Sequence, residues 1–235
     1  MDGYVKVLLF VAVGTAAMLL PMSIAATCRK VRIWKAALIA LYAAICGTVS
    51  AYLWFLLENQ FWGGISFFGA VFLVPLGFLL VPRLFRESHE IMMDIFAPGI
   101  CMMLAIMKVQ CLTSGCCQGR EICLYGIPWL FPSQLAELIN GLLLMVILLI
   151  MVFRKKHYGE LYPWFMILYG VTRFVLQFFR EEWVSRPSIW PNFGTIWSAL
   201  SLAIGILWLY LRHKKLKIRL FVPRKNKHGD LRFKS

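Results

Sequence analysis

The feature that most constrains the fold of this chain is a series of seven apolar stretches. Each has roughly the 20 residues that a helix needs to cross the hydrocarbon core of a bilayer. A composition of 60% hydrophobic and 15% charged residues excludes an ordinary soluble domain and a disordered chain. We therefore predict an all-α polytopic membrane protein with seven transmembrane helices. The third stretch, which contains Gly69 and Pro75, is alternatively a broken or re-entrant helix. The stretches lie at residues 4–26, 35–57, 61–81, 91–110, 133–153, 161–179 and 189–211.

The placement of basic residues predicts the orientation of these helices. Of the 25 Lys and Arg residues, 19 fall in the C-terminal tail or in every second connection, counted from the one after the first stretch. Because cytoplasmic loops are enriched in Lys and Arg, we expect these connections to be cytoplasmic. The N-terminus is then outside and the C-terminus is cytoplasmic. The basic residues of these connections are Arg29, Lys30, Arg32, Lys35, Arg83, Arg86, Arg154, Lys155 and Lys156.

The net charge of +14 is concentrated at the C-terminal end, where residues 212–235 contribute +9. A basic segment directly after an apolar stretch is typical of a cytosolic flank that faces anionic lipid. It is a weaker sign of nucleic-acid binding, and we expect no nucleic-acid partner. We predict a transmembrane domain over residues 1–211 and a basic cytoplasmic tail over residues 212–235.

Ionisable side chains occur inside the stretch at 161–179. Tyr169, Arg173 and Gln177 are spaced by four residues and therefore share one face of a helix. A charged group at the centre of a bilayer costs at least ~2.5–3.5 kcal/mol, so such groups are functional candidates.

Two other stretches place polar groups at the same depth as Arg173. Ser133, Gln134 and Glu137 open one stretch, and Lys108 lies near the end of another. With the predicted orientation, all of them fall in the outer-leaflet layer. Arg173 and Lys108 would form a cationic site for a phosphate, which a guanidinium binds through two hydrogen bonds. The alternative is a buried ion pair of Glu137 with either cation, which only holds the helices together.

Asp94 is a further ionisable group, near the predicted inner end of the 91–110 stretch. It lies about one helical turn from Glu90. Two structural roles explain Asp94 as well as a chemical role does. In one its carboxylate reaches the membrane interface, and in the other it caps a helix.

Four of the seven cysteines cluster after the same stretch. Their spacing, C-x4-C-C-x5-C, matches no common zinc or iron–sulfur pattern, and we expect no metal. Apolar packing or one structural disulfide explains them best, and a redox role is a weaker alternative because the chain has no C-x-x-C pair. The four residues are Cys111, Cys116, Cys117 and Cys123.

Short motifs, in order along roughly residues 60–200, resemble those of one family. The sequence has GGISFFGA at 63–70, DIFAP at 94–98, PSQLAE at 132–137 and YGVTRF at 169–174. They resemble the motifs G-G-x-x-x-H-G-G, D-x-x-A-P, P-S-Q-L-x-E and Y-G-x-x-R-F of the prolipoprotein diacylglyceryl transferase family. The segment at 108–120 is similar to the family's G-R-I-G-N-F-x-N-G-x-x-x-G-R.

The chain departs from these motifs at five positions. Phe68 stands where the family has His, and Lys108 stands where it has Arg. Cys111 replaces an Asn, and Cys116 replaces an acidic residue. Phe131 precedes Pro132 at a position where the family often has His.

The resemblance implies a seven-helix enzyme of the bacterial cytoplasmic membrane. Such an enzyme transfers the diacylglyceryl group of phosphatidylglycerol to the lipobox cysteine thiol of an exported prolipoprotein, and glycerol phosphate leaves. The implied partners are phosphatidylglycerol, prolipoprotein signal peptides and membrane lipid, and no cofactor is implied. The implied catalytic residues are Arg173, Tyr169 and Glu137. The implied substrate-binding residues are Lys108, Gln134, Ser133, Gly115, Gly119, Arg120 and Cys111.

Two other function classes stay open from the sequence. Phe68 in place of an imidazole suits a non-catalytic relative that binds anionic lipid. The cysteine cluster suits a membrane thiol oxidoreductase, which a double substitution of Cys116 and Cys117 by serine would inactivate.

Overall fold

The computed structural model describes residues 3–60, 64–80, 87–117, 119–124, 127–154, 158–180 and 193–213. These residues form seven helices and one two-stranded hairpin. The elements are α1 (Gly3–Cys28), α2 (Ile33–Asn59), α3 (Phe67–Leu80), α5 (His89–Ser114), β1 (Glu121–Leu124), β2 (Ile127–Leu130), α6 (Ser133–Arg154), α7 (Leu161–Gln177) and α9 (Phe193–His213).

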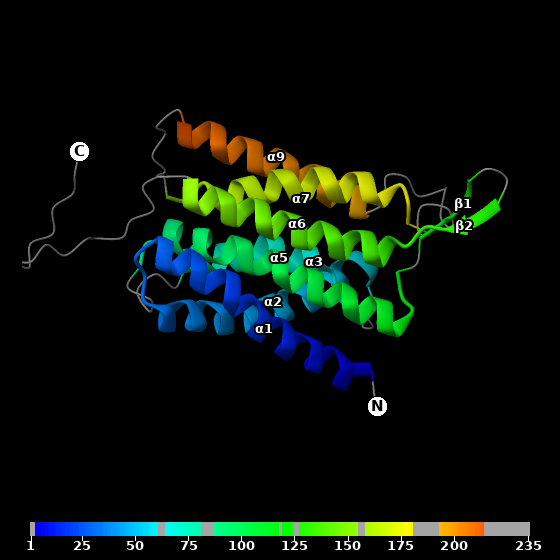
Figure 1. Ribbon diagram of the computed structural model, residues 1–235, viewed down its shortest axis with the longest axis horizontal. Helices are drawn as coiled ribbons and strands as arrows, with labels where there is room; N and C mark the ends of the chain where they lie inside the picture. Colours follow the sequence, from blue (N-terminus) through cyan, green and yellow to red (C-terminus); the bar gives the residue numbers. More distant parts are fainter. Residues whose placement is uncertain are drawn as a thin grey trace, which may run out of the picture.

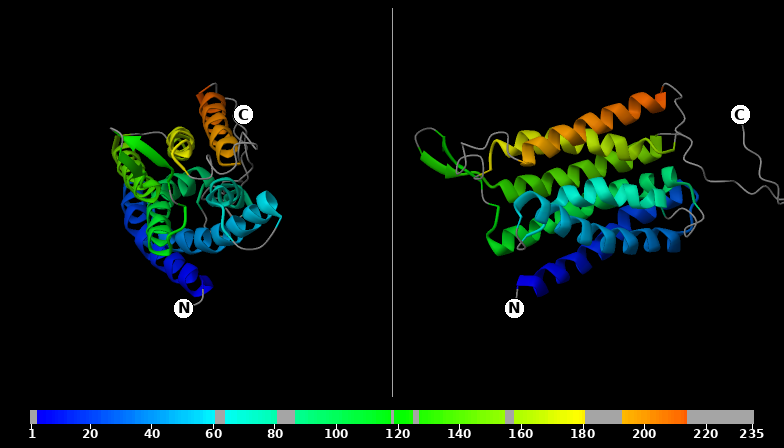
Figure 2. Two further views of the ribbon diagram at one scale, coloured as in Figure 1. Left: turned by 90° about the vertical axis from the view of Figure 1, so that its right-hand side faces the viewer. Right: turned by 180° about the vertical axis from the view of Figure 1, so that it is seen from behind.

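The helices lie side by side along the long axis, and successive helices alternate in direction (Figure 1). The antiparallel hairpin β1–β2 extends from one end of the bundle, which we call the hairpin end. Helix α5 is central, because it contacts α1, α2, α3, α6 and α7. Helix α9 packs on α7 at the edge, as the two views of Figure 2 show. The described chain begins toward the hairpin end and α9 finishes at the opposite end.

The length and composition of these helices suit a polytopic membrane protein. Five helices are long and apolar enough to cross a bilayer: α1, α2, α5, α6 and α9. Many large apolar side chains on their outer faces are exposed, among them Leu20, Leu57 and Phe153. In water such exposure would be unfavourable, but in a bilayer these side chains face lipid. The predicted class, a helical multi-pass membrane protein, is confirmed.

Each of the seven predicted stretches contains a helix, but two are shorter than predicted. Helix α3 has 14 residues and α7 has 17. Residues 61–63 and 81 of the third stretch and 189–192 of the seventh lie outside the described residues, as does the tail from 214 onward. The small hairpin at 121–130 was not predicted from the sequence, and the fold class remains all-α.

Close backbone contacts hold α9 against α7. At Gly170 an added Cβ would lie 2.8 Å from the carbonyl oxygen of Ser198. Ser201 also donates a hydrogen bond of 3.0 Å to the carbonyl oxygen of Met166. Small residues and interhelical hydrogen bonds are the usual means of helix association where lipid removes the hydrophobic driving force.

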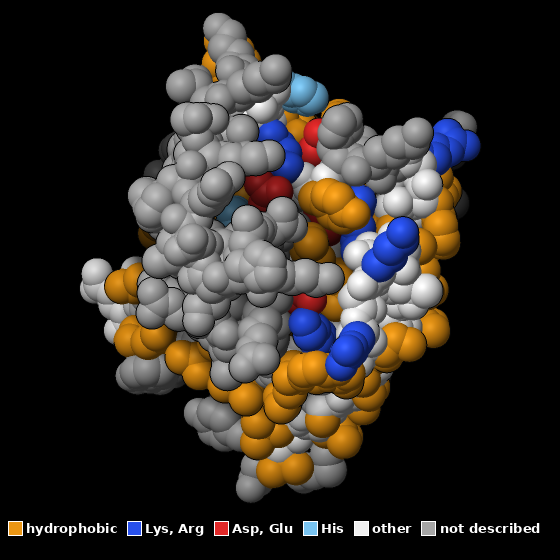
Figure 3. Space-filling view, turned by 90° about the vertical axis from the view of Figure 1, so that its left-hand side faces the viewer, with side chains coloured by type: hydrophobic (Ala, Val, Ile, Leu, Met, Phe, Trp, Pro, Cys, Tyr) orange, Lys and Arg blue, Asp and Glu red, His pale blue; other side chains and the backbone are white. Residues whose placement is uncertain are grey.

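The end opposite the hairpin is held by a buried carboxylate. Asp94 is 0% exposed and forms an ion pair of 2.9 Å with Arg29. Its oxygens also accept hydrogen bonds from the backbone N–H groups of Gly159, at 2.8 Å, and Leu161, at 3.1 Å. Asp94 therefore caps the start of α7, which favours the capping alternative over a carboxylate that reaches the interface. Figure 3 looks onto this end, where basic and acidic side chains gather above hydrophobic flanks.

We expect Asp94→Asn to destabilise the protein by about 3–5 kcal/mol, because it removes one partner of a buried charge pair. Thermal unfolding in detergent micelles measures the loss. Glu87→Gln is the control, since Glu87 pairs with Lys35 in a more accessible place, and it should cost about 1 kcal/mol or less. Equal effects of the two substitutions would contradict the structural role of Asp94.

Candidate active site

The centre of the candidate site is the carboxylate of Glu137, in the second turn of α6. Glu137 is 3% exposed. Its Oε2 lies 2.7 Å from Nζ of Lys108 on α5, and its Oε1 lies 2.5 Å from Nη1 of Arg173 on α7. Nη1 of Arg180, just after α7, lies 3.3 Å from the same Oε1. We call these four side chains the Glu137 cluster.

The Glu137 cluster carries more positive than negative charge. Three of its side chains are cations and one is an anion, and Lys108 and Arg173 alone already exceed the charge of Glu137. In a site away from water, such an imbalance strongly favours an anionic ligand, because charges interact more strongly at low dielectric. The cluster therefore combines both sequence interpretations: Glu137 pairs with the cations, and positive charge remains.

Gln177 adds polar groups beside this charge. It lies one turn after Arg173 on the same face of α7 and is 1% exposed. Neither its Oε1 nor its Nε2 has a hydrogen-bond partner among the described residues. It packs on Gly194 of α9, where an added Cβ would lie 2.8 Å from Oε1. Because buried amides are nearly always paired, Gln177 is suited to bind a polar ligand.

Tyr169 lies one turn before Arg173, in a group of aromatic rings. Its ring centroid is 5.5 Å from that of Phe165 and 5.8 Å from those of Phe67 and Phe68. Tyr169 and Phe68 are both buried. Helix α3 thus forms an apolar wall beside the cluster, and Phe68 is part of it.

The start of α6 holds the loop that follows α5. Ser133 donates a hydrogen bond of 2.6 Å to the carbonyl oxygen of Cys117. Gln134 donates one of 2.8 Å to the carbonyl oxygen of Cys116. Both side chains are therefore engaged in fixing the loop, and a direct contact of either with a substrate remains a prediction.

Gly115 ends α5 in the left-handed conformation, with φ of 66°, and its N–H donates to the carbonyl oxygen of Cys111. All seven cysteines lie in the described residues and carry free thiols. A hydrogen bond from the Cys111 thiol, with Arg180 and Lys108 nearby, lowers the pKa of Cys117 to about 5. Burial raises the pKa of Cys116.

Gly119 and Arg120 connect this loop to the end of α7. The N–H of Arg120 donates a hydrogen bond of 3.0 Å to the carbonyl oxygen of Phe179, and Gly119 forms an antiparallel bridge with Arg180. The Arg120 guanidinium lies 5.8 Å from the ring centroid of Phe179. The backbone of this segment therefore positions Arg180, while the Arg120 side chain lies over a ring and not beside Glu137.

Gly119→Ala is expected to destabilise the protein by about 1–3 kcal/mol through overpacking. An added Cβ would lie 2.0 Å from the carbonyl oxygen of Phe131, a backbone atom that moves only if the hairpin moves. The matched control is Gly47→Ala inside α2, where the nearest atoms would lie at 3.6 Å. Gly47→Ala should stabilise the protein by roughly 0.5–1 kcal/mol, because alanine is more favourable than glycine inside a helix. Thermal unfolding of both variants tests the predicted opposite signs.

The structure brings together Lys108, Glu137 and Arg173, as the depth argument predicts, with Tyr169 on the adjacent turn. It adds Arg180 and Gln177, which were not among the predicted site residues. The four-residue spacing already placed Gln177 on the helical face of Tyr169 and Arg173, but no catalytic or binding role was assigned to Gln177 from the sequence. Arg180 lies beyond α7, where the bridge to Gly119 and a hydrogen bond of 3.3 Å from its N–H to the carbonyl oxygen of Gln177 hold its backbone.

The fold and the cluster define a class: a helical multi-pass membrane protein with a cationic site toward one end of its bundle. Within that class, the chain belongs to the prolipoprotein diacylglyceryl transferase family, whose pattern matches residues 7–211. The resemblance seen in the motifs is thus confirmed.

Relatives of this chain carry a consistent name. The phosphatidylglycerol–prolipoprotein diacylglyceryl transferase 2 of Clostridium perfringens is 25% identical over 168 residues, which cover 66% of this chain and 64% of the relative. The phosphatidylglycerol–prolipoprotein diacylglyceryl transferase of Acinetobacter baumannii is 27% identical over 192 residues, 72% of this chain and 70% of the relative. The one of Campylobacter lari is 39% identical over 88 residues, 36% of this chain and 32% of the relative. The match to the first of these spans just under two thirds of that relative's length.

Proposed function

We propose that this protein transfers the diacylglyceryl group of phosphatidylglycerol to the cysteine thiol of exported prolipoproteins. The observation that carries the proposal is the Glu137 cluster, with its three cations on one carboxylate. Membership of the family and the names of the relatives support it. Neither favours the two alternatives, a lipid-binding relative without activity and a thiol oxidoreductase.

The proposal includes a topology. All seven helices cross the bacterial cytoplasmic membrane within residues 1–211, with the hairpin end outside and the tail at 212–235 in the cytoplasm. The alternating directions of the helices support this arrangement (Figure 1). So does the basic end opposite the hairpin, because Lys and Arg favour the cytoplasmic side. The acceptor cysteine of an exported precursor would then meet the site from the outer side.

The reaction moves charge toward the cations. The acceptor thiol loses its proton, and its sulfur attacks the glycerol carbon that carries the phosphate ester. A C–S bond forms, the C–O bond breaks, and glycerol phosphate leaves with the electron pair. The phosphate changes from a singly charged diester to a monoester with more negative charge. Cations held in place before the reaction stabilise this change with little reorganisation.

Each residue of the site has a proposed role in this reaction. The Arg173 guanidinium binds the phosphate through two hydrogen bonds, and Lys108 adds a point charge. Glu137 positions both cations. The Tyr169 hydroxyl, one turn away, is the proposed group that assists proton transfer from the thiol. Gln177 is proposed to bind the polar glycerol headgroup.

The remaining predicted residues form the outer boundary of the site. Their proposed role is to bind the substrates as they enter, directly or by holding the loop between α5 and α6. They are Gly115, Gly119, Arg120, Cys111, Ser133 and Gln134.

A transfer assay tests the function. The purified protein is mixed with phosphatidylglycerol vesicles and a lipobox peptide, and the peptide mass and released glycerol phosphate are both followed. A gain of one diacylglyceryl group with an equal release of glycerol phosphate is the expected result. Phosphatidylglycerol binding with neither product would replace the proposal with a lipid-binding role. In that case Phe68→His would test whether an imidazole in the aromatic wall restores turnover.

A further inference from the structure

We propose that Cys111, Cys116 and Cys117 form a binding site for one thiophilic divalent metal ion, with Zn²⁺ as the expected occupant. The sulfur atoms of the three residues all lie within 4.8 Å of one another. We call these residues the thiol cluster. The inference concerns metal binding alone and stands whether or not the protein catalyses the transfer.

The backbone builds the thiol cluster from residues that are not spaced as in known zinc motifs. Gly115 turns the chain at the end of α5, and the N–H of Cys116 donates a hydrogen bond of 3.2 Å to the carbonyl oxygen of Cys111. Cys117 also has a positive φ, of 58°. These turns bring the chain back over the last turn of α5, which is why the C-x4-C-C spacing gave no metal prediction.

The start of α6 fixes the loop that carries two of the thiols. Ser133 and Gln134 bind the carbonyl oxygens of Cys117 and Cys116. A preformed arrangement lowers the cost of ordering ligands around a metal. Zinc–sulfur bonds of 2.3 Å in tetrahedral geometry place sulfur atoms about 3.8 Å apart. The three sulfur atoms, which lie within 4.8 Å of one another, would need to approach by at most about 1 Å to reach this spacing.

The charges around the thiol cluster suit a metal–thiolate complex. Three thiolates and a divalent ion have one net negative charge. Lys108 and Arg180 both act electrostatically on Cys117 and offset that charge. Thiolate ligands select soft ions such as Zn²⁺ over Mg²⁺ and Ca²⁺. Three protein ligands also leave a fourth position for water or another small ligand.

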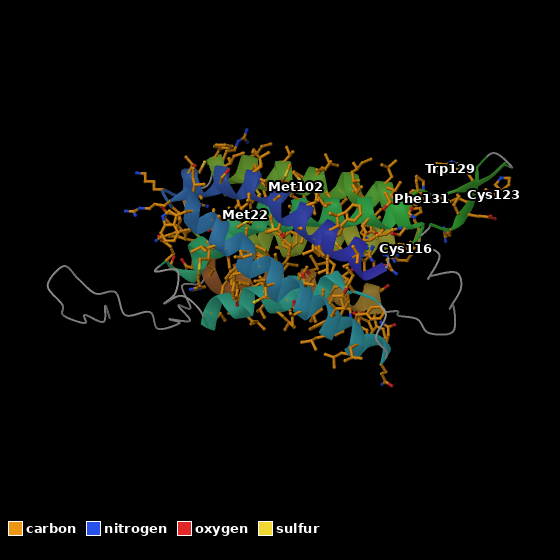
Figure 4. The ribbon with its side chains drawn as sticks, turned by 90° about the horizontal axis from the view of Figure 1, so that it is seen from below. Met22, Met102, Cys116, Cys123, Trp129 and Phe131 are labelled. Atoms are coloured by element: carbon orange, nitrogen blue, oxygen red, sulfur yellow. The ribbon has the colours of Figure 1, made fainter. Side chains whose placement is uncertain are left out.

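An ion can reach the thiol cluster from solvent. Cys116 is exposed, while Cys111 and Cys117 are half-buried. Figure 4 shows Cys116 at the end of the bundle and Cys123 farther out on the hairpin. Cys123 therefore provides an exposed cysteine near the same loop that is not part of the cluster.

The first test is a titration of the reduced, full-length protein in detergent micelles with Co²⁺. We expect thiolate-to-cobalt charge-transfer bands and tetrahedral d–d bands that saturate at one ion per chain and disappear when Zn²⁺ is added. Cys117→Ser should weaken Co²⁺ binding more than 100-fold, since even the loss of an outer-shell partner costs about 10–100-fold. Cys123→Ser is the control and should leave the bands unchanged. The absence of charge-transfer bands in the unchanged protein would overturn the proposal. So would bands in Cys111→Ser, Cys116→Ser and Cys117→Ser that are as strong as those of the unchanged protein.

A second measurement uses the unchanged protein, so it does not depend on a variant that folds. Iodoacetamide labelling is followed by mass spectrometry with and without Zn²⁺. Zn²⁺ should protect Cys111, Cys116 and Cys117 and leave the labelling of Cys123 unchanged. Equal labelling with and without Zn²⁺ would contradict the metal site. Two cluster residues that stay unlabelled in both conditions would identify a disulfide instead.

Discussion

Arg173→Ala is expected to abolish transfer, with a fall in rate of at least about 10³-fold. Removal of one donor from a site that stabilises developing negative charge costs about 10²–10³ in rate, and Arg173 supplies two donors and a charge. Phosphatidylglycerol affinity should fall by about 10–100-fold, because a hydrogen bond to a charged group contributes roughly 1.5–3 kcal/mol. The transfer assay and a vesicle-binding assay measure the two effects.

The fold should survive this substitution, because Glu137 keeps Lys108 and Arg180 as partners. The matched control is Arg212→Ala at the opposite end of the bundle, where Arg212 pairs with Glu90 at 3.0 Å. Its transfer rate should stay within about twofold of the unchanged protein, as a surface pair contributes little. Retained transfer in Arg173→Ala would refute the assignment of the phosphate site.

Glu137→Gln is expected to destabilise the protein as strongly as Asp94→Asn does. It leaves Lys108 and Arg173 close together without the carboxylate that lies between them. Breaking a buried ion pair by removing one partner costs about 3–5 kcal/mol. We expect a large fall in Tm in detergent micelles without lipid.

Phosphatidylglycerol should partly restore the Tm of Glu137→Gln, because its phosphate supplies the missing negative charge. The rise in Tm on adding this lipid should exceed the rise that the unchanged protein shows. Glu90→Gln is the control, since the Glu90 side chain is 39% exposed and its loss should be small. A Tm for Glu137→Gln equal to that of Glu90→Gln would show that the Glu137 cluster does not support the fold.

The central part of the site could be predicted from the sequence because helix geometry fixes depth. Lys108, Glu137 and Arg173 lie on three different helices, yet a rise of about 1.5 Å per residue and alternating directions place them in one layer. The sequence left open whether they pair with each other or bind an anion. The structure shows that both Lys108 and Arg173 pair with the single carboxylate of Glu137, which the sequence could not indicate.

The rest of the site depends on loops, where no periodic pattern exists. The thiol cluster forms because Gly115 and Cys117 adopt positive φ values, and cysteine rarely indicates such a turn. The hairpin forms from short strands, Glu121–Leu124 and Ile127–Leu130, that lack a clear alternation of polar and apolar residues. The pairing of the Gly119 segment with Arg180, which holds Arg180 beside Glu137, is another such feature. Contacts of this kind follow from tertiary structure and not from spacing.

The short helices beside the site have a consequence for the surrounding lipid. At about 1.5 Å per residue, the 14 residues of α3 extend about 21 Å and the 17 residues of α7 about 26 Å. Both are shorter than a hydrocarbon core of about 30 Å, and they meet where Phe67 and Phe68 pack on Tyr169. A bilayer adjusts to such hydrophobic mismatch by local thinning, at a fraction of a kcal/mol per Å. In the proposed topology we therefore expect the headgroup layer on this side of the protein to be drawn inward, toward the depth of Arg173. The acyl-chain length of the host membrane then becomes a determinant of how readily a lipid reaches the site.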